Sequence, residues 1–368
     1  ERRIGMVRLL LGYFTTAAQQ SQLRLLLQDR DSSGRTLLIW AAQKGHSDTV
    51  EVMINAIRAG NLQDRLLLMT DEAGQTIAHC SVYEGHTDIL QLIRKSLETK
   101  VWHKLIKQPD SSGVTSLHLA VLNGQILAFE QIKSLVADDI WTDLLLIKAD
   151  SGTSCMFSAA CKGNIEIMES IQKSLNSEQW YQALQERDQY SEWTALHSAV
   201  KLHHQNVVEL IHKSLTKEHW YQLLNSVDRS GRTALHLAAW IDSTTIMRFI
   251  HETLPDGNDW EHLIQLTDTH GFTALHTAVY VYRYNRNNKM LLFLQESVKD
   301  PDIWKALLSA KTPSAKIQNM PSENYDIEGC KQAIEQMENM KETVAGIATE
   351  LNTLKFDPQS KYCFRLSI

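Results

Sequence analysis

The sequence has little of what disulfide-rich, metal-binding or membrane-spanning proteins need. Among 368 residues there are five cysteines and six prolines, and no two cysteines form a Cys-x-x-Cys pair. An odd cysteine number argues against a disulfide framework, and the missing Asn-x-Ser/Thr acceptors agree with the reducing, cytoplasmic location that we expect. No apolar run approaches the roughly 18 residues of a membrane helix, so we expect no membrane span.

Positive charge is also in short supply. Lys and Arg number 37 against 43 Asp and Glu, which gives a net charge of −6. Nucleic-acid binding needs a strongly basic face, so we expect no nucleic-acid partner. The Gly-rich nucleotide motifs and the Gly-x-Ser-x-Gly nucleophile motif are missing as well. The sequence therefore predicts a protein that is not an enzyme and takes no cofactor.

One short phrase recurs seven times along the chain. It begins with Thr or Ser, and its commonest form is Thr-Ala-Leu-His. Successive copies start 40, 39, 39, 40, 39 and 40 residues apart, which indicates one structural unit repeated in series. The first residues of the seven copies are Thr36, Thr76, Thr115, Ser154, Thr194, Thr233 and Thr273.

The residues around the phrase define a larger frame. Asp-x-x-Gly, a tight-turn signal, precedes the phrase in five copies, and small residues such as Ala41-Ala42 follow it. A Gly ends the first helix in four copies, and an apolar helical pattern comes next. This frame resembles the ankyrin repeat family over residues 29–310. The resemblance implies an all-α, ankyrin-type helical solenoid of helix-turn-helix repeats with short β-turn fingers, seven repeats plus caps.

The repeats depart from the family pattern in several places. The Pro that the family has after Thr is missing throughout, Phe157 replaces the His of the fourth copy, and Glu192 replaces the turn Gly of the fifth. The period is 39–40 residues rather than 33. The extra residues carry a Trp and apolar residues at helical spacing, which predicts a short third helix whose Trp packs in the core rather than binding a ligand. These tryptophans are Trp102, Trp141, Trp180, Trp220, Trp260 and Trp304.

The remaining segments complete the predicted domain organisation. Residues 1–28 are expected to form an N-terminal helical cap on the seven ankyrin-like repeats of residues 29–310. Residues 311–324 hold two prolines and predict a linker. Residues 325–355 predict a long helix that either caps the last repeat or forms a coiled coil, and residues 356–368 a flexible tail.

Fifteen histidines raise the question of a metal site. Five of them stand in the repeated phrase, where a spacing of 39–40 residues keeps them from meeting at one ion. The family resemblance implies that they bond instead to the backbone near the finger turns. We therefore expect no metal site. These histidines are His79, His118, His197, His236 and His276.

The resemblance further implies that the fingers and first helices line a concave surface that binds protein partners. Exposed Trp, Tyr and Arg side chains are typical anchors of such interfaces. The alternative for the aromatic residues is packing between adjacent first helices. For the Arg- and Tyr-rich stretch 280–289, the alternatives are binding an acidic or phosphorylated peptide and a solvated helix extension. The candidate partner-binding residues are Trp40, Tyr83, Leu119, Trp193, Leu237, Trp240, Tyr280, Arg283 and Arg286.

The leading functional hypothesis is a non-catalytic scaffold that binds a protein partner on this concave finger and inner-helix face. A second hypothesis is a regulatory or sensory ankyrin region of a larger polypeptide, of the channel or immune-receptor type, because Glu1-Arg2-Arg3 shows no Met and no signal peptide. A third is a structural element that forms a homo-oligomer through residues 325–355.

Overall fold

The computed structural model describes residues 25–59, 66–254, 257–285 and 287–309. These residues form twenty α-helices arranged in seven successive repeats, so the predicted all-α helical stack is confirmed. The predicted linker, the long helix at 325–355, the tail and residues 1–24 of the predicted cap lie outside the described residues. No helix among those described is long and apolar enough to cross a membrane.

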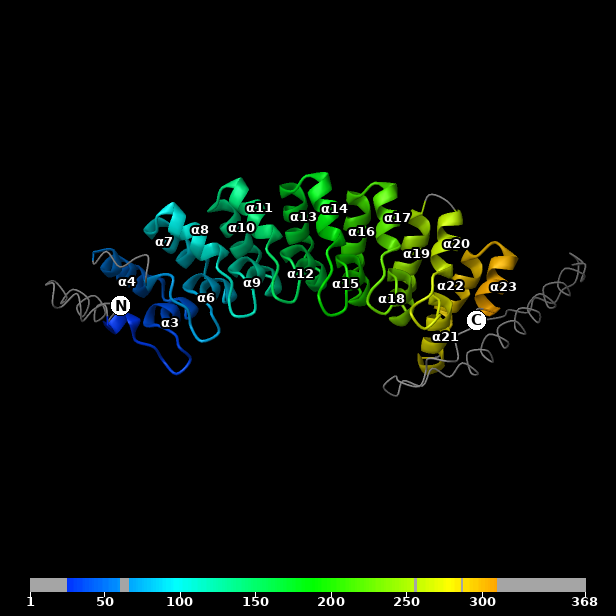
Figure 1. Cartoon of the computed structure of the whole chain (residues 1–368), viewed down its shortest axis with the longest axis horizontal. Helices are drawn as coiled ribbons and strands as arrows, with labels where there is room; N and C mark the ends of the chain where they lie inside the picture. Colours follow the sequence, from blue (N-terminus) through cyan, green and yellow to red (C-terminus); the bar gives the residue numbers. More distant parts are fainter. Residues whose placement is uncertain (1–24, 60–65, 255–256, 286, 310–368) are drawn as a thin grey trace, which may run out of the picture.

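Each repeat begins with a short inner helix. Figure 1 shows these helices side by side along one edge of the stack, which forms a shallow arch with the inner helices on its inner side. Neighbouring inner helices contact one another along the whole series. They are α3 (Leu37–Gln43), α6 (Ile77–Tyr83), α9 (Ser116–Leu122), α12 (Cys155–Lys162), α15 (Ala195–Lys201), α18 (Ala234–Trp240) and α21 (Ala274–Asn285).

An outer helix follows each inner helix and packs against it. Its apolar residues, such as Ile89, Leu90 and Ile93 in the second repeat, are completely buried. Figure 1 shows the outer helices as a second layer above the row of inner helices. They are α4 (Ser47–Ala59), α7 (Thr87–Ser96), α10 (Ile126–Ser134), α13 (Ile165–Ser174), α16 (Gln205–Ser214), α19 (Thr244–Thr253) and α22 (Lys289–Ser297).

The predicted third helix is present in repeats two to seven. Five of its six tryptophans are at most 3% exposed, and Trp304 in the last repeat is partly buried, which confirms that this residue packs in the core. The third helices are α8 (Thr99–Lys107), α11 (Asp138–Leu146), α14 (Ser177–Gln185), α17 (Lys217–Leu224), α20 (Gly257–Gln265) and α23 (Pro301–Ser309).

The repeated phrase builds the start of each inner helix. The Thr115 hydroxyl accepts the backbone N–H of His118 at 3.4 Å, and the His118 Nδ1 accepts the backbone N–H of Thr115 at 3.3 Å. This reciprocal capping box satisfies two backbone donors that a helix start leaves without partners. The same arrangement recurs at Thr76, Thr194 and Thr233, so the phrase is explained by helix capping.

The Asp-x-x-Gly turns join neighbouring repeats through their backbones. In the third finger, Asp110 Oδ1 accepts the N–H groups of Ser112 and Val114, which fixes the turn. The N–H of Ser111 then donates to the Ala73 carbonyl of the preceding finger at 3.0 Å. Five equivalent bonds, from the Glu72, Asp150, Gln189, Arg229 and Thr269 N–H groups, connect all seven fingers in one row.

Glycine at the end of an inner helix adopts positive φ, as Gly163 does at 70°. Two repeats keep this geometry without glycine, with His203 at φ 61° and Asp242 at φ 54°. The non-glycine turn residue Glu192 also has φ 56°. Because side chains other than glycine rarely occupy this region, these three positions carry local strain that packing between repeats must offset.

Candidate functional site

Three histidines of the repeated phrase bridge neighbouring repeats. His236 Nε2 lies 2.9 Å from the Phe272 carbonyl in the next finger, and His79 and His197 make the equivalent contacts to Val114 and Arg232. With Nδ1 accepting from the cap residue, Nε2 carries the proton and donates to this carbonyl. Burial lowers the pKa of His197 to about 4, so its ring is neutral near pH 7. The expected contact with the finger backbone is therefore present.

The tryptophan row joins repeats on the opposite side of the stack. The Nε1–H of Trp180 donates to Ser214 Oγ at 2.8 Å, and Trp220 and Trp260 donate to hydroxyls of Thr253 and Ser297. Each acceptor lies at the end of the outer helix in the following repeat. These three indoles thus serve both packing and a polar link between repeats.

Trp40, Leu119 and Leu237 stand four residues after the helix cap in their repeats. The structure buries Leu119 at 8% exposed and Leu237 completely, and the equivalent residues of every other repeat after the first are also buried. The expectation that these two leucines reach a partner does not hold, because this position faces the neighbouring inner helix. Trp40 is 39% exposed.

Tyr83, Trp240 and Tyr280 stand seven residues after the cap and lie at the open side of the inner helices. Tyr83 is 49% exposed. The rings of Trp240 and Tyr280 stack across α18 and α21, with centroids 5.8 Å apart and planes 11° apart. Lys201, at the same position of α15, places its Nζ 5.4 Å from the centre of the Trp240 ring. The structure therefore brings together three side chains from consecutive inner helices.

The fifth finger differs from the others. The Nε1–H of Trp193 donates to the Asp228 carboxylate at 3.1 Å, so this predicted anchor links fingers five and six. Tyr190 at the tip of this finger is 69% exposed and was not among the predicted site residues. The departure from Asp-x-x-Gly at Glu192 was the sequence signal that marked this finger as unusual.

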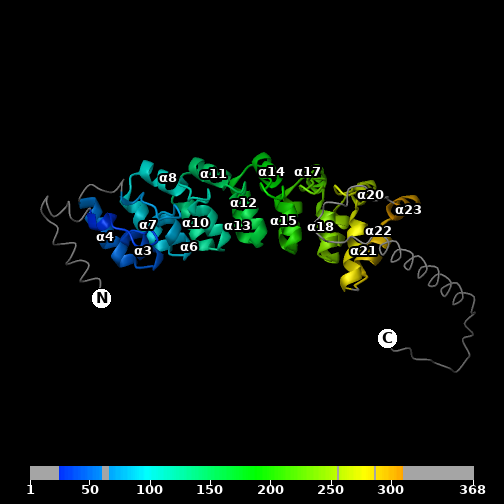
Figure 2. The ribbon, with the colours of Figure 1, turned by 60° about the horizontal axis from the view of Figure 1, so that its bottom comes forward.

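The seventh inner helix is extended. Helix α21 has twelve residues, against seven or eight in the other inner helices, and projects beyond their row in both Figure 1 and Figure 2. The amides of Asn285 and Asn287 donate to the Asp242 carboxylate of the preceding repeat at 2.8 and 2.6 Å. The alternative of a helix extension therefore describes residues up to Asn285. The side chain of Arg283 and all of Arg286 lie outside the described part.

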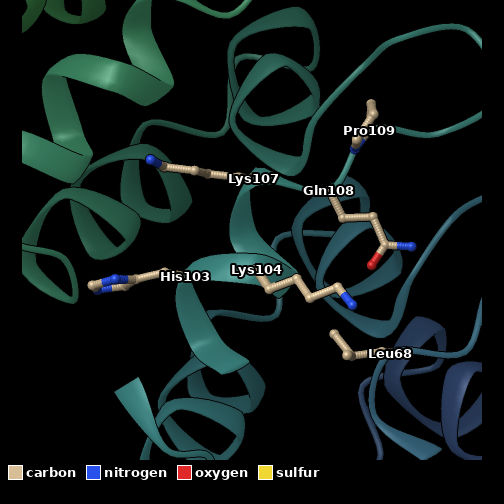
Figure 3. A pocket seen from close by; sticks show the side chains of 6 residues that line it. All are labelled: Leu68, His103, Lys104, Lys107, Gln108 and Pro109. Atoms are coloured by element: carbon tan, nitrogen blue, oxygen red, sulfur yellow. The ribbon is translucent and has the colours of Figure 1, made fainter. Parts of the chain in front are cut away.

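Two hollows of the described surface are open to solvent. One of about 510 Å³ lies beside α8 and is lined by Leu68, Lys104, Gln108 and Pro109, with Lys107 and His103 at its margin. Figure 3 shows Lys104 and Gln108 directed toward Leu68, whereas His103 points away. Lys107 is already paired with Asp143 at 2.7 Å. Nothing in this hollow brings together an acid, a base and a nucleophile.

Other groups with potential chemistry are occupied by the fold. Burial raises the pKa of the Cys80 thiol to about 12, so this cysteine is not a thiolate at neutral pH. No group of three or more metal-ligating side chains occurs among the described residues. The arrangement that the described chain does offer is a long inner face with aromatic and cationic side chains, a form suited to binding.

Comparisons with known proteins agree with this geometry. Residues 3–101 match the family described as ankyrin repeats (3 copies), beginning within the segment assigned to the predicted cap. The chain is similar to the crystal structure of the ankyrin repeat domain of Bcl-3, described as a unique member of the IkappaB protein family. The TM-score is 0.54 at 18% identity, over 72% of this chain and all of that one. No curated protein matches by sequence.

Proposed function

Because the helices of this chain form an ankyrin-repeat stack, we propose that it is a non-catalytic module that binds a protein partner on its concave inner face. Ankyrin repeats typically mediate protein–protein interaction. The observation that carries the proposal is the row of Tyr83, Lys201, Trp240 and Tyr280. These residues share one repeat position, at which Tyr83 is exposed and the other three side chains are partly exposed.

The contrast with the neighbouring positions supports this reading. The residues four, five and six places after the cap are buried in every repeat from the second to the seventh, because they pack between inner helices. The fold therefore constrains those positions to small or apolar residues. It places no such demand on Tyr83, which is half exposed, so its large aromatic ring is available to anchor a partner.

Affinity capture with three matched proteins tests the proposal. The bait variants are Tyr83→Ala combined with Trp240→Ala on the inner face, and Leu127→Ala on the outer helix α10, where Leu127 is 79% exposed. We expect a partner captured by the wild type to be retained by Leu127→Ala and lost by the double variant. Circular dichroism confirms that each bait is folded. A partner that both variants retain equally would move the binding site away from the inner face.

A further inference from the structure

One ammonium group in the C-terminal half of the inner face, that of Lys201, lies over the Trp240 ring without a paired carboxylate in the described part of the chain. The pKa of Lys201 is lowered by burial and by the nearby Arg232 guanidinium. Asp228 is paired with Arg232 at 2.8 Å. Asp242 keeps its charge, but it accepts the amides of Asn285 and Asn287 and makes no ion pair with Lys201.

Apolar surface lies directly beside this charge. Leu202, the residue after Lys201, is exposed, and Ile241, the residue after Trp240, is partly buried. The extended helix α21 borders the surface on one side, and its Tyr280 stacks on Trp240. The result is an ammonium group next to an aromatic and aliphatic surface on three consecutive inner helices. This patch, formed by Lys201, Leu202, Trp240, Ile241 and Tyr280, is named the α15–α21 patch.

The geometry of Trp240 restricts which partner fits. Its indole receives the Lys201 ammonium from α15 and the Tyr280 ring from α21, the two helices that flank α18. Two side chains of the protein itself therefore already lie against the indole. A nucleic-acid base would need a free face of this ring for stacking. A carboxylate, in contrast, needs only the outward side of the ammonium group, and an apolar side chain needs only the adjacent Leu202 surface.

We propose that the α15–α21 patch binds a partner segment in which an Asp or Glu lies next to a large apolar residue. The carboxylate pairs with the Lys201 ammonium, and the apolar side chain covers Leu202 and the edge of Trp240. The charge of the patch thus sets the class of partner, because an acidic residue neutralises Lys201 and a basic one meets an uncompensated like charge. This inference rests on the proposed protein-binding function and adds the chemistry of the segment that is bound.

Selection from a displayed random-peptide library tests the proposal, with the folded full chain as bait. We expect the wild type and Leu127→Ala to enrich peptides with Asp or Glu beside Leu, Ile, Phe or Trp. The variant Lys201→Glu should bind these peptides at least about tenfold more weakly and should itself enrich Lys- or Arg-containing peptides. The variant Lys201→Gln removes the charge without reversing it and should show an intermediate loss of peptide affinity. It replaces Lys201→Glu in the test if that variant does not fold.

The possible failures can be told apart. Peptides that bind without acidic enrichment, or that are insensitive to both Lys201 variants, overturn the inference about charge. If such peptides are still lost on Tyr83→Ala, the inner face remains the binding surface and only the partner chemistry is refuted. Peptide binding insensitive to Tyr83→Ala, Trp240→Ala and both Lys201 variants contradicts the proposed function too. Tighter binding of a single-stranded RNA oligonucleotide than of any selected peptide also overturns the inference.

Discussion

The polar link made by the tryptophan row can be measured by comparing two equivalent residues. The Nε1–H of Trp180 donates to Ser214 Oγ at 2.8 Å, whereas the buried Nε1–H of Trp141 has no acceptor in the described part of the chain. Both indoles are at most 3% exposed. Replacing each by Phe removes a similar volume from a similar environment, so the packing loss is largely common to the two variants.

The two variants should differ in what the loss of the indole N–H does to the free energy of unfolding. Trp180→Phe loses one hydrogen bond, which contributes about 1 kcal/mol net, while the Ser214 hydroxyl keeps its bond to the Ile211 carbonyl at 2.7 Å. Trp141→Phe removes a buried donor without a partner, which relieves a desolvation cost of at least about 1 kcal/mol. We therefore expect Trp180→Phe to lower the free energy of unfolding by about 2 kcal/mol more than Trp141→Phe.

Urea unfolding followed by circular dichroism gives the global difference. Because long repeat arrays can lose cooperativity, hydrogen exchange of α14 and α16 should locate the loss in Trp180→Phe. The variant Trp180→Ala serves as the reference for deleting the whole ring and should cost about 3–5 kcal/mol. Equal costs for the two Phe variants would refute the reasoning, since the indole hydrogen bond would then contribute nothing to the contact between repeats.

Further predictions concern pH, backbone strain and the inner face. Burial lowers the pKa of His118 and His197 to about 4. The unfolded chain, with a histidine pKa near 6.5, therefore binds protons first, and stability present above pH 6.5 should be lost as pH falls to 4, by about 3 kcal/mol per residue. Urea midpoints across this range measure the loss, and His197→Gln should flatten the profile. His203→Gly should raise the free energy of unfolding by about 1 kcal/mol, because glycine adopts the backbone angle φ of 61° at this position without strain. Gly163→Ala should lower the free energy of unfolding, because a Cβ there would lie 2.6 Å from the His204 ring. Thermal melts measure both shifts. Tyr83→Ala should change stability by less than about 0.5 kcal/mol in the same melts, since its ring is half exposed; a larger loss would mean that the ring supports the fold.

The repeat pattern predicted the architecture well because it records local chemistry. Thr115 and His118 cap a helix through contacts three residues apart, and Asp110 closes a turn with its own neighbours, so their spacing is visible in the sequence. The Trp of the third helix is similar, since its apolar partners follow at helical spacing. These features need no knowledge of distant residues, and the structure confirms each of them.

The candidate site was harder to predict because exposure depends on what the neighbouring repeats cover. Trp40, Leu119 and Leu237 share one position, yet the leucines are buried and the tryptophan is open. Trp193 is an unusual finger residue by sequence, but its indole is bonded to Asp228 of the next repeat. The exposed Tyr190 was missed because the departure at Glu192 marks its finger as unusual without showing which side chain of that finger stays exposed.

The sequence by itself determined the repeating helices, their caps and turns, and the buried tryptophan row, because these follow from interactions within one repeat and from its period. Tertiary structure alone decided which side chains remain on the inner face and which charges remain without a counter-charge. Lys201, Trp240 and Tyr280 lie about 40 residues apart in the chain and meet only because the stack superimposes equivalent positions of consecutive repeats. Stacking sets that juxtaposition, since each repeat buries its neighbour's side and leaves the same edge open to solvent.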